Sequence, residues 1–83
     1  MIIKYLSNRE SFIKLIESIG FEYKSMGIYY YKEFRIDLYR LYYDFYNERE
    51  FEWIYDISLN DWTPINKYLK KELRSYKLKA LLR

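Results

Sequence analysis

The side chains that most often carry out acid–base or nucleophilic chemistry are missing from this 83-residue sequence, which contains no histidine and no cysteine. Their absence removes the commonest general base, the commonest transition-metal ligands and every Ser-His or Cys-His nucleophile pair. Gly20 and Gly27 are the two glycines, too few for a loop that cradles phosphate. The sequence therefore favours a protein that binds over one that catalyses.

Carboxylates are the remaining candidates for catalysis. Asp37, Asp44 and Asp56 fall in expected neighbouring strands, and they would hold Mg²⁺ if they converged, as in a metal-dependent nuclease. Their spacing matches no specific metal motif, and an outer sheet face in water accounts for them as simple solvated residues. We expect no metal site and no cofactor.

The clearest candidate for binding is a row of cations in the C-terminal segment. At 100° per residue they fall on one side of an expected helix. They are Lys67, Lys70, Lys71, Arg74 and Lys77. This face has the chemistry to follow a phosphate backbone, on free nucleic acid or on a nucleoprotein partner. A solvated helix face that is attracted to an acidic sheet is the alternative.

The net charge of +3 divides unevenly along the chain. Residues 1–32 carry five Lys/Arg and three Asp/Glu, residues 33–61 carry three and eight, and residues 62–83 carry seven and one. The eight carboxylates of the middle segment have the charge to imitate a phosphate backbone and occupy a nucleic-acid groove on a partner. Within that segment we expect the contact around a hairpin, at Glu48, Glu50 and Glu52 together with Asp44 and Asp56.

Tyrosine is a further candidate for partner contact. The core of so short a chain cannot hold all five Phe, two Trp and twelve Tyr, so several must be exposed. Exposed Tyr is enriched at protein interfaces, and we expect Tyr29, Tyr31 and Tyr43 to contact a protein partner. The plainer explanation is that Tyr fills strands and shows its hydroxyl to water. Exposed tyrosines and the apolar tail at 78–82 also allow a homodimer.

The elements that must position these residues are two helices flanking a sheet. Apolar residues at helical spacing followed by Gly20 predict a helix over about 8–19. Residues 28–58 are rich in aromatic and β-branched residues and contain no proline, which predicts strands. The alternation changes parity near Tyr39, predicting a bulge or turn there. Thr63 as N-cap and Pro64 at the first helical position predict the start of the last helix.

This order of elements predicts a single α+β domain over residues 1–83, in two layers. We expect an α-β(3-4)-α arrangement, with an antiparallel meander of three or four strands and both helices on one face. The expected core is Phe12, Ile16, Ile19, Ile36, Leu38, Trp53, Ile65, Leu69 and Leu73. No apolar run approaches the ~18 residues of a membrane span and no signal peptide is recognised, so we expect a cytoplasmic protein.

Short length, abundant Tyr, Lys and Ile, and the lack of His, Cys and a catalytic constellation give the chain a distinct character. In these features it resembles small proteins of phages and mobile elements, among them the anti-CRISPR proteins. The resemblance implies a protein without an active site that inhibits or modulates an RNA-guided nuclease, or a related nucleic-acid-processing complex. It assigns a role to no residue. A direct RNA- or DNA-binding module that uses the basic helix face is the alternative.

Overall fold

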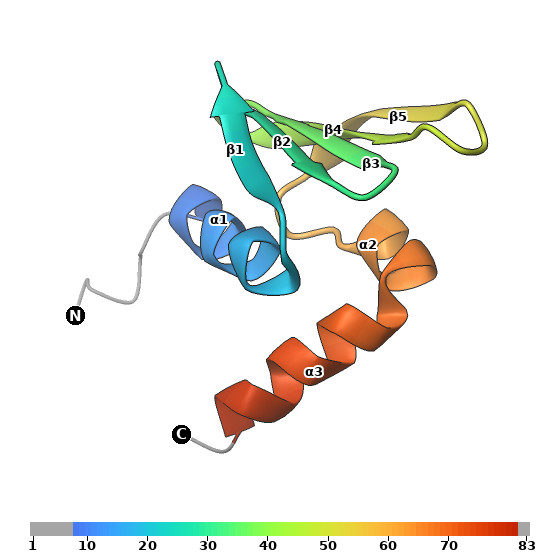
Figure 1. Ribbon diagram of the computed structural model, residues 1–83. Helices are drawn as coiled ribbons and strands as arrows, with labels where there is room; N and C mark the ends of the chain where they lie inside the picture. The colour runs from blue at the N-terminus through green and yellow to red at the C-terminus, as the bar shows by residue number, and fades with distance from the viewer. Residues whose placement is uncertain (1–7, 82–83) are drawn as a thin grey trace.

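The structure, a computed structural model, describes residues 8–81. Figure 1 shows a sheet with the helices gathered below it. The helices are α1 (Asn8–Ile19), α2 (Thr63–Tyr68) and α3 (Lys70–Leu81). The strands are β1 (Glu22–Ser25), β2 (Ile28–Tyr31), β3 (Phe34–Leu38), β4 (Tyr42–Asn47) and β5 (Glu52–Ser58). The fold is α+β, as predicted, but the sheet has five strands rather than three or four, and the C-terminal helix is divided in two.

Helix α1 has the predicted bounds and buries its apolar stripe against the sheet. The buried side chains are Phe12, Leu15, Ile16 and Ile19. Gly20 ends the helix at φ +132°, and its N–H donates to the carbonyl oxygen of Ile16 at 3.1 Å. A Cβ on Gly20 would lie 2.6 Å from the ring of Tyr31. Glycine here both stops the helix and lets that ring pack against its backbone.

The sheet is an antiparallel meander in which every strand pairs with its neighbour in sequence, in the order β1-β2-β3-β4-β5. The turn between β1 and β2 is made by Met26 and Gly27, with φ of 49° and 81°. Two successive positive φ values match the right-handed twist of the strands that they join. The carbonyl of Gly27 also accepts the N–H of Leu38 at 2.8 Å, which ties this turn to the end of β3.

The predicted change of parity between β3 and β4 is confirmed, and it is a turn. Alternate residues of the two strands are buried against the helices. They are Phe34, Ile36, Leu38, Tyr43 and Phe45. The turn lies at 39–41, where the N–H of Tyr39 donates to the carbonyl of Tyr42 at 2.9 Å. The turn resets the alternation, so both strands present their apolar residues to the same side.

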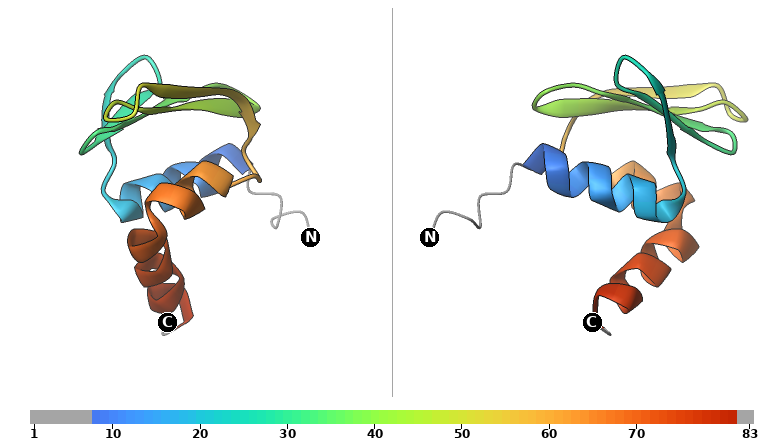
Figure 2. Two further views of the ribbon diagram at one scale, coloured as in Figure 1. Left: turned by 90° about the vertical axis from the view of Figure 1, so that its right-hand side faces the viewer. Right: turned by 60° about the vertical axis from the view of Figure 1, so that its left-hand side comes forward.

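All three helices lie on one side of the sheet, as both views in Figure 2 show. The core lies between the layers, where the ring centroids of Phe12 and Tyr43 are 4.4 Å apart. The ring of Tyr68 on α2 packs against Phe34 and Phe45 at centroid distances of 5.7 and 6.0 Å. Eight of the nine predicted core residues are buried. The prediction is wrong for the ninth, Trp53, which lies on the opposite face of the sheet.

A bulge in β5 explains the error at Trp53. Tyr43 pairs with Ile57 and Phe45 pairs with Ile54, so one residue of β4 faces two residues of β5. Beyond this extra residue the strand's alternation is reversed, which brings Ile57 to the core side and leaves Trp53 on the opposite side. Strict alternation along residues 53–57 would have put both on one face.

The C-terminal helix predicted from Pro64 onward is broken at Leu69, where φ is −123° and ψ is 36°. Neither proline nor glycine lies at the break, and the side chain of Leu69 is buried in the core there. The N–H of Leu73 still donates to the carbonyl of Leu69 at 2.9 Å. As a result α2 stays under the sheet, whereas α3 projects away from it (Figure 1).

The start of α2 also differs from the prediction, since Thr63 is not the N-cap. Trp62 occupies that position without a side-chain cap. Asp61 instead accepts hydrogen bonds at Oδ1 from the Thr63 N–H at 3.0 Å and from the Thr63 hydroxyl at 2.6 Å. Hydrogen bonds from the Thr63 hydroxyl and N–H lower the pKa of Asp61. Pro64 lies in the first turn, where its missing N–H costs nothing.

Candidate functional site

The five predicted cations are all exposed, but the bend at Leu69 divides them between two helices. Lys67 belongs to α2, under the sheet, and the other four lie on the projecting helix α3. Lys70, Arg74 and Lys77 share one shallow hollow with Asn66 and Leu73. Three of the predicted cations are therefore brought together on one side of α3, whose Glu72 accepts a hydrogen bond from Tyr31 of the sheet.

These three cations have no counterion among residues 8–81. Within the described part of the chain, Lys70, Arg74 and Lys77 form no ion pair; the two ion pairs found there are Lys32–Glu72 and Arg35–Asp37. Cations kept apart from carboxylates on a protruding element are free to pair with an external anion. These contacts do not support the alternative, in which carboxylates of the acidic sheet neutralise the whole basic face.

Lys67 has a different environment from the cations of α3. Its Nζ lies 4.9 Å from the ring centroid of Tyr68. A hydrogen bond with Tyr68 and the charges of Tyr68, Glu52 and Glu50 raise the pKa of Lys67. The hydroxyl of Tyr68 in turn donates to Glu52. Lys67 thus belongs to a contact between α2 and the β4–β5 hairpin.

The predicted acidic hairpin is present but is only partly free for a partner. Glu48 and Glu50 are exposed, whereas Glu52 is half-buried and engaged by Tyr68. Buried Asn47 accepts the N–H groups of Arg49 and Glu50 at Oδ1, at 3.1 and 3.4 Å, which holds the loop. The available charge of the hairpin is therefore two carboxylates rather than three.

Two of the three tyrosines predicted to contact a partner are core residues, and that prediction is wrong for them. Tyr29 is 5% exposed and Tyr43 is fully buried. The Tyr43 hydroxyl donates to the carbonyl of Asp61 at 2.6 Å, and burial, with a smaller contribution from Asp61, raises its pKa. Tyr31 is half-buried, and its hydroxyl donates to Glu72 on α3 at 3.0 Å.

The exposed aromatic surface lies elsewhere, on the outer face of the sheet, and residue spacing alone did not reveal it. Strand register places Tyr30, Arg35, Tyr46 and Trp53 in one row across β2 to β5. The guanidinium carbon of Arg35 lies 5.9 Å from the ring centroid of Tyr30 and 5.2 Å from that of Trp53. The signal that would have found this row is the parity of β4 combined with a bulge in β5.

Arg35 is fixed at the centre of this row by a two-point contact. Its Nε and Nη2 donate to the two carboxylate oxygens of Asp37 at 2.7 and 3.1 Å. This paired geometry is stronger than a single charged hydrogen bond and orients the guanidinium plane. The hydrogen bond to Asp37 also raises the pKa of Arg35. Arg35 thus contacts two rings and one carboxylate of the outer face.

The rings beyond Arg35 continue the row toward the sheet edge. Trp53 packs on Tyr46 with centroids 4.7 Å apart and stacks on Tyr55 at 5.7 Å. Tyr55 is 64% exposed. The Nε1–H of Trp53 is covered yet has no hydrogen-bond partner in the described residues. A buried polar group of this kind costs about 1–3 kcal/mol, so stability alone does not explain the indole here.

The three aspartates considered for Mg²⁺ each have a structural environment of their own. Asp37 is paired with Arg35, as described above. Asp44 is buried and accepts the N–H of Asp56 at 2.9 Å, which holds the β5 bulge. Asp56 is exposed and has φ of 54°. No group of three His, Cys, Asp or Glu residues that could hold a metal ion occurs in the part of the chain that the structure describes.

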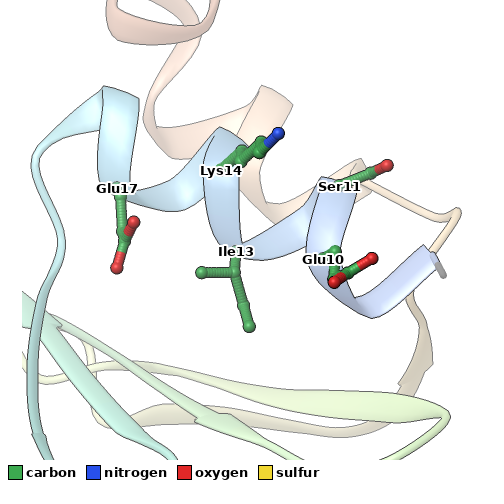
Figure 3. Close-up of a pocket in the computed structure, with 5 residues that line it drawn as sticks. All are labelled: Glu10, Ser11, Ile13, Lys14 and Glu17. Atoms are coloured by element: carbon green, nitrogen blue, oxygen red, sulfur yellow. The ribbon is translucent and has the colours of Figure 1, made fainter. Parts of the chain in front are cut away.

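A further hollow lies beside α1 and is lined by Glu10, Ser11, Ile13, Lys14 and Glu17. Figure 3 shows Ile13 and Glu17 directed toward the sheet side of the helix and Lys14 directed away from it. The side chains do not converge on a single point, so the hollow does not form a compact polar site.

None of the helices within residues 8–81 has the length and apolar character that a membrane span needs.

The apolar tail predicted to support a homodimer is described only at Leu78, which is 56% exposed. The side chains of Leu81 and Leu82 lie outside the described part of the structure.

Comparison with protein-family models, curated proteins and solved structures gave no match. The function must therefore be argued from these surfaces.

Proposed function

We propose that this protein is a small non-enzymatic binding protein that inhibits or modulates a nucleic-acid-processing complex in the cytoplasm. An RNA-guided nuclease is the kind of complex that the anti-CRISPR resemblance suggests. The observation that carries the proposal is the cluster of Lys70, Arg74 and Lys77 around one hollow on projecting helix α3, without internal counterions in the described residues. Its role is to contact phosphates of the nucleic acid in that complex.

The dimensions of the cluster suit a phosphate backbone. Lys70 and Lys77 are seven residues apart, which corresponds to about 10 Å along a helix axis. A strand of B-form DNA advances ~3.4 Å per phosphate, so about three phosphates fall within that length. Asn66 at the bend adds an uncharged amide that can also hydrogen-bond a phosphate oxygen.

The experiment compares wild-type protein with a charge-reversed triple variant, Lys70→Glu, Arg74→Glu and Lys77→Glu. Each protein is tagged and used to capture partners from the native host, with and without nuclease treatment, and bound proteins are identified by mass spectrometry. We expect wild-type protein to recover a nucleoprotein complex and to inhibit its activity. The triple variant should lose both properties.

A matched control separates a local effect from a change in net charge. Lys24, Arg40 and Arg49 are exposed and belong to β1, the turn at 39–41 and the β4–β5 hairpin rather than to α3. Their reversal to Glu changes the net charge by the same amount. This control should retain capture and inhibition. Equal loss in both triple variants, or capture of no protein by the wild type, would contradict the proposal.

Direct binding of free RNA or DNA is the second candidate, and the same unpaired cluster favours it. Gel shift with labelled single- and double-stranded RNA and DNA tests it without any partner protein. If this function is correct, affinity should fall with salt, and the triple variant should reduce the salt slope by about 2 to 3. Strong binding to naked nucleic acid with no captured protein would select this candidate over the first.

A further inference from the structure

The outer face of the sheet carries no helix in the described residues, and Figure 1 shows it open above β3, β4 and β5. Its aromatic side chains form the row from Tyr30 to Trp53 and continue to Tyr55. Arg35 lies over Trp53 and is paired with Asp37. The other charged residues beside these rings are carboxylates, buried Asp44 and exposed Asp56, neither of which forms an ion pair in residues 8–81. Exposed rings beside unneutralised carboxylates are the surroundings that a cationic group prefers.

The molecule shows this chemistry at its own Arg35. That guanidinium lies over the rings of Tyr30 and Trp53 and is paired with Asp37. On β5, Tyr55 stacks on Trp53 and is followed in sequence by the exposed Asp56. Arg35 lies over Trp53, but no described Lys or Arg lies over the Tyr55 ring. The exposed ring of Tyr55 thus lies next to a carboxylate residue and has no cation over it among the described residues.

We propose that the outer face of β4 and β5 binds an arginine or lysine side chain on a basic protein surface, with Tyr55 and Trp53 stacking on the cation and Asp56 pairing with it. Asp44, buried on β4 opposite the bulge, accepts the N–H of Asp56 and adds negative charge beside it. The occupant follows from charge, because Asp44 and Asp56, the carboxylates beside these rings, form no ion pair in the described residues and repel a phosphate backbone. This surface is separate from α3 and does not require the proposed contact with nucleic acid.

Two tryptophans make the proposal directly measurable. The indole N–H of Trp53 has no described partner on the outer face, whereas that of Trp62 donates to the carbonyl of Leu59 at 3.1 Å on the helix side. In ¹⁵N-labelled full-length protein we expect a short arginine-rich peptide to shift the Trp53 indole signal and leave the Trp62 signal in place. A glutamate-rich peptide and single-stranded oligo(dT) should leave the Trp53 signal unchanged.

Point variants assign the contact to individual groups. Tyr55→Ala removes the exposed ring, and Asp56→Asn removes the charge while keeping a residue type that tolerates φ of 54°. Each should weaken peptide affinity about two- to fivefold, the range for an exposed cation–π or ion-pair contact. Tyr55→Phe keeps the ring, and Glu50→Gln removes an equal charge from the hairpin, so both should bind like wild type.

The outcomes separate this proposal from the proposed function. Reversal of Lys70, Arg74 and Lys77 should leave the Trp53 shift intact, even where it abolishes contact with nucleic acid. An unchanged Trp53 signal at saturating peptide would overturn the assignment. A shift of the Trp53 signal by the oligonucleotide would also overturn it, because it would show that this face binds nucleic acid. An equal loss of affinity in Glu50→Gln and Asp56→Asn would overturn it as well, because it would show general charge attraction.

Discussion

The two faces of the sheet are both lined with aromatic rings but hold them by different means. On the inner face the rings pack against helices, and the hydroxyls of Tyr43 and Tyr31 donate to Asp61 and Glu72. On the outer face the rings pack against each other and against Arg35, and the N–H of Trp53 lacks a described partner. The inner face is closed by the helices, whereas the outer face leaves rings partly exposed.

The largest effect should come from removing a ring from the inner face. Tyr43→Ala deletes a fully buried ring next to Phe12 and should lower the free energy of unfolding by about 3–5 kcal/mol. Tyr42→Ala, on the partly exposed outer side of the same strand, should cost about 1 kcal/mol or less. Urea denaturation followed by circular dichroism measures both, and similar losses would remove the distinction between the faces.

A substitution at the edge of the inner face should have the next largest effect. Gly20→Ala places a Cβ 2.6 Å from the Tyr31 ring and requires φ of +132° from an L-residue. We expect a loss of about 1–3 kcal/mol, because strained backbone and a displaced ring both oppose folding. If thermal unfolding shows no decrease in melting temperature, the ring of Tyr31 is not held as described.

On the outer face, removing the central cation should cost less. Arg35→Met keeps much of the side-chain length but loses the guanidinium contacts to Tyr30 and Trp53 and leaves Asp37 unpaired. The expected loss is about 1 kcal/mol in the free energy of unfolding, since the site is partly open to solvent. Trp53 fluorescence should change, while Arg49→Met in the exposed hairpin should affect neither measurement.

The smallest effect concerns pH at the contact between the sheet and α3. Burial alone would raise the pKa of Glu72, but a backbone hydrogen bond, the Tyr31 hydroxyl and Lys32 lower it below its ordinary value of 4.5. A lowered folded-state pKa contributes stability above the ordinary value, and that stability is lost as pH falls through the folded pKa. The stability difference between wild type and Glu72→Gln should therefore shrink below pH 4.5. A difference that stays constant on acidification would show that the charge of Glu72 contributes nothing.

Local patterns predicted much of the fold because their causes are local. The spacing of apolar residues before Gly20 gave α1 its bounds, since one stripe and one stop signal suffice to define a helix. The exposure of the cations from Lys67 to Lys77 also followed from helical periodicity. The break at Leu69 did not, because no proline or glycine marks it and the buried position of that side chain depends on the assembled core.

The sequence by itself determined the class of fold, the absence of His and Cys chemistry and the segregation of charge, because composition and periodicity are properties of the chain alone. Only the tertiary structure decided which aromatic residues are core and which are surface. A bulge near Asp56 and a turn at 39–41 change the parity of the strands, and every later side chain changes face with them. The turn places Tyr43 on the buried side, and the bulge leaves Trp53 on the opposite face from Ile57.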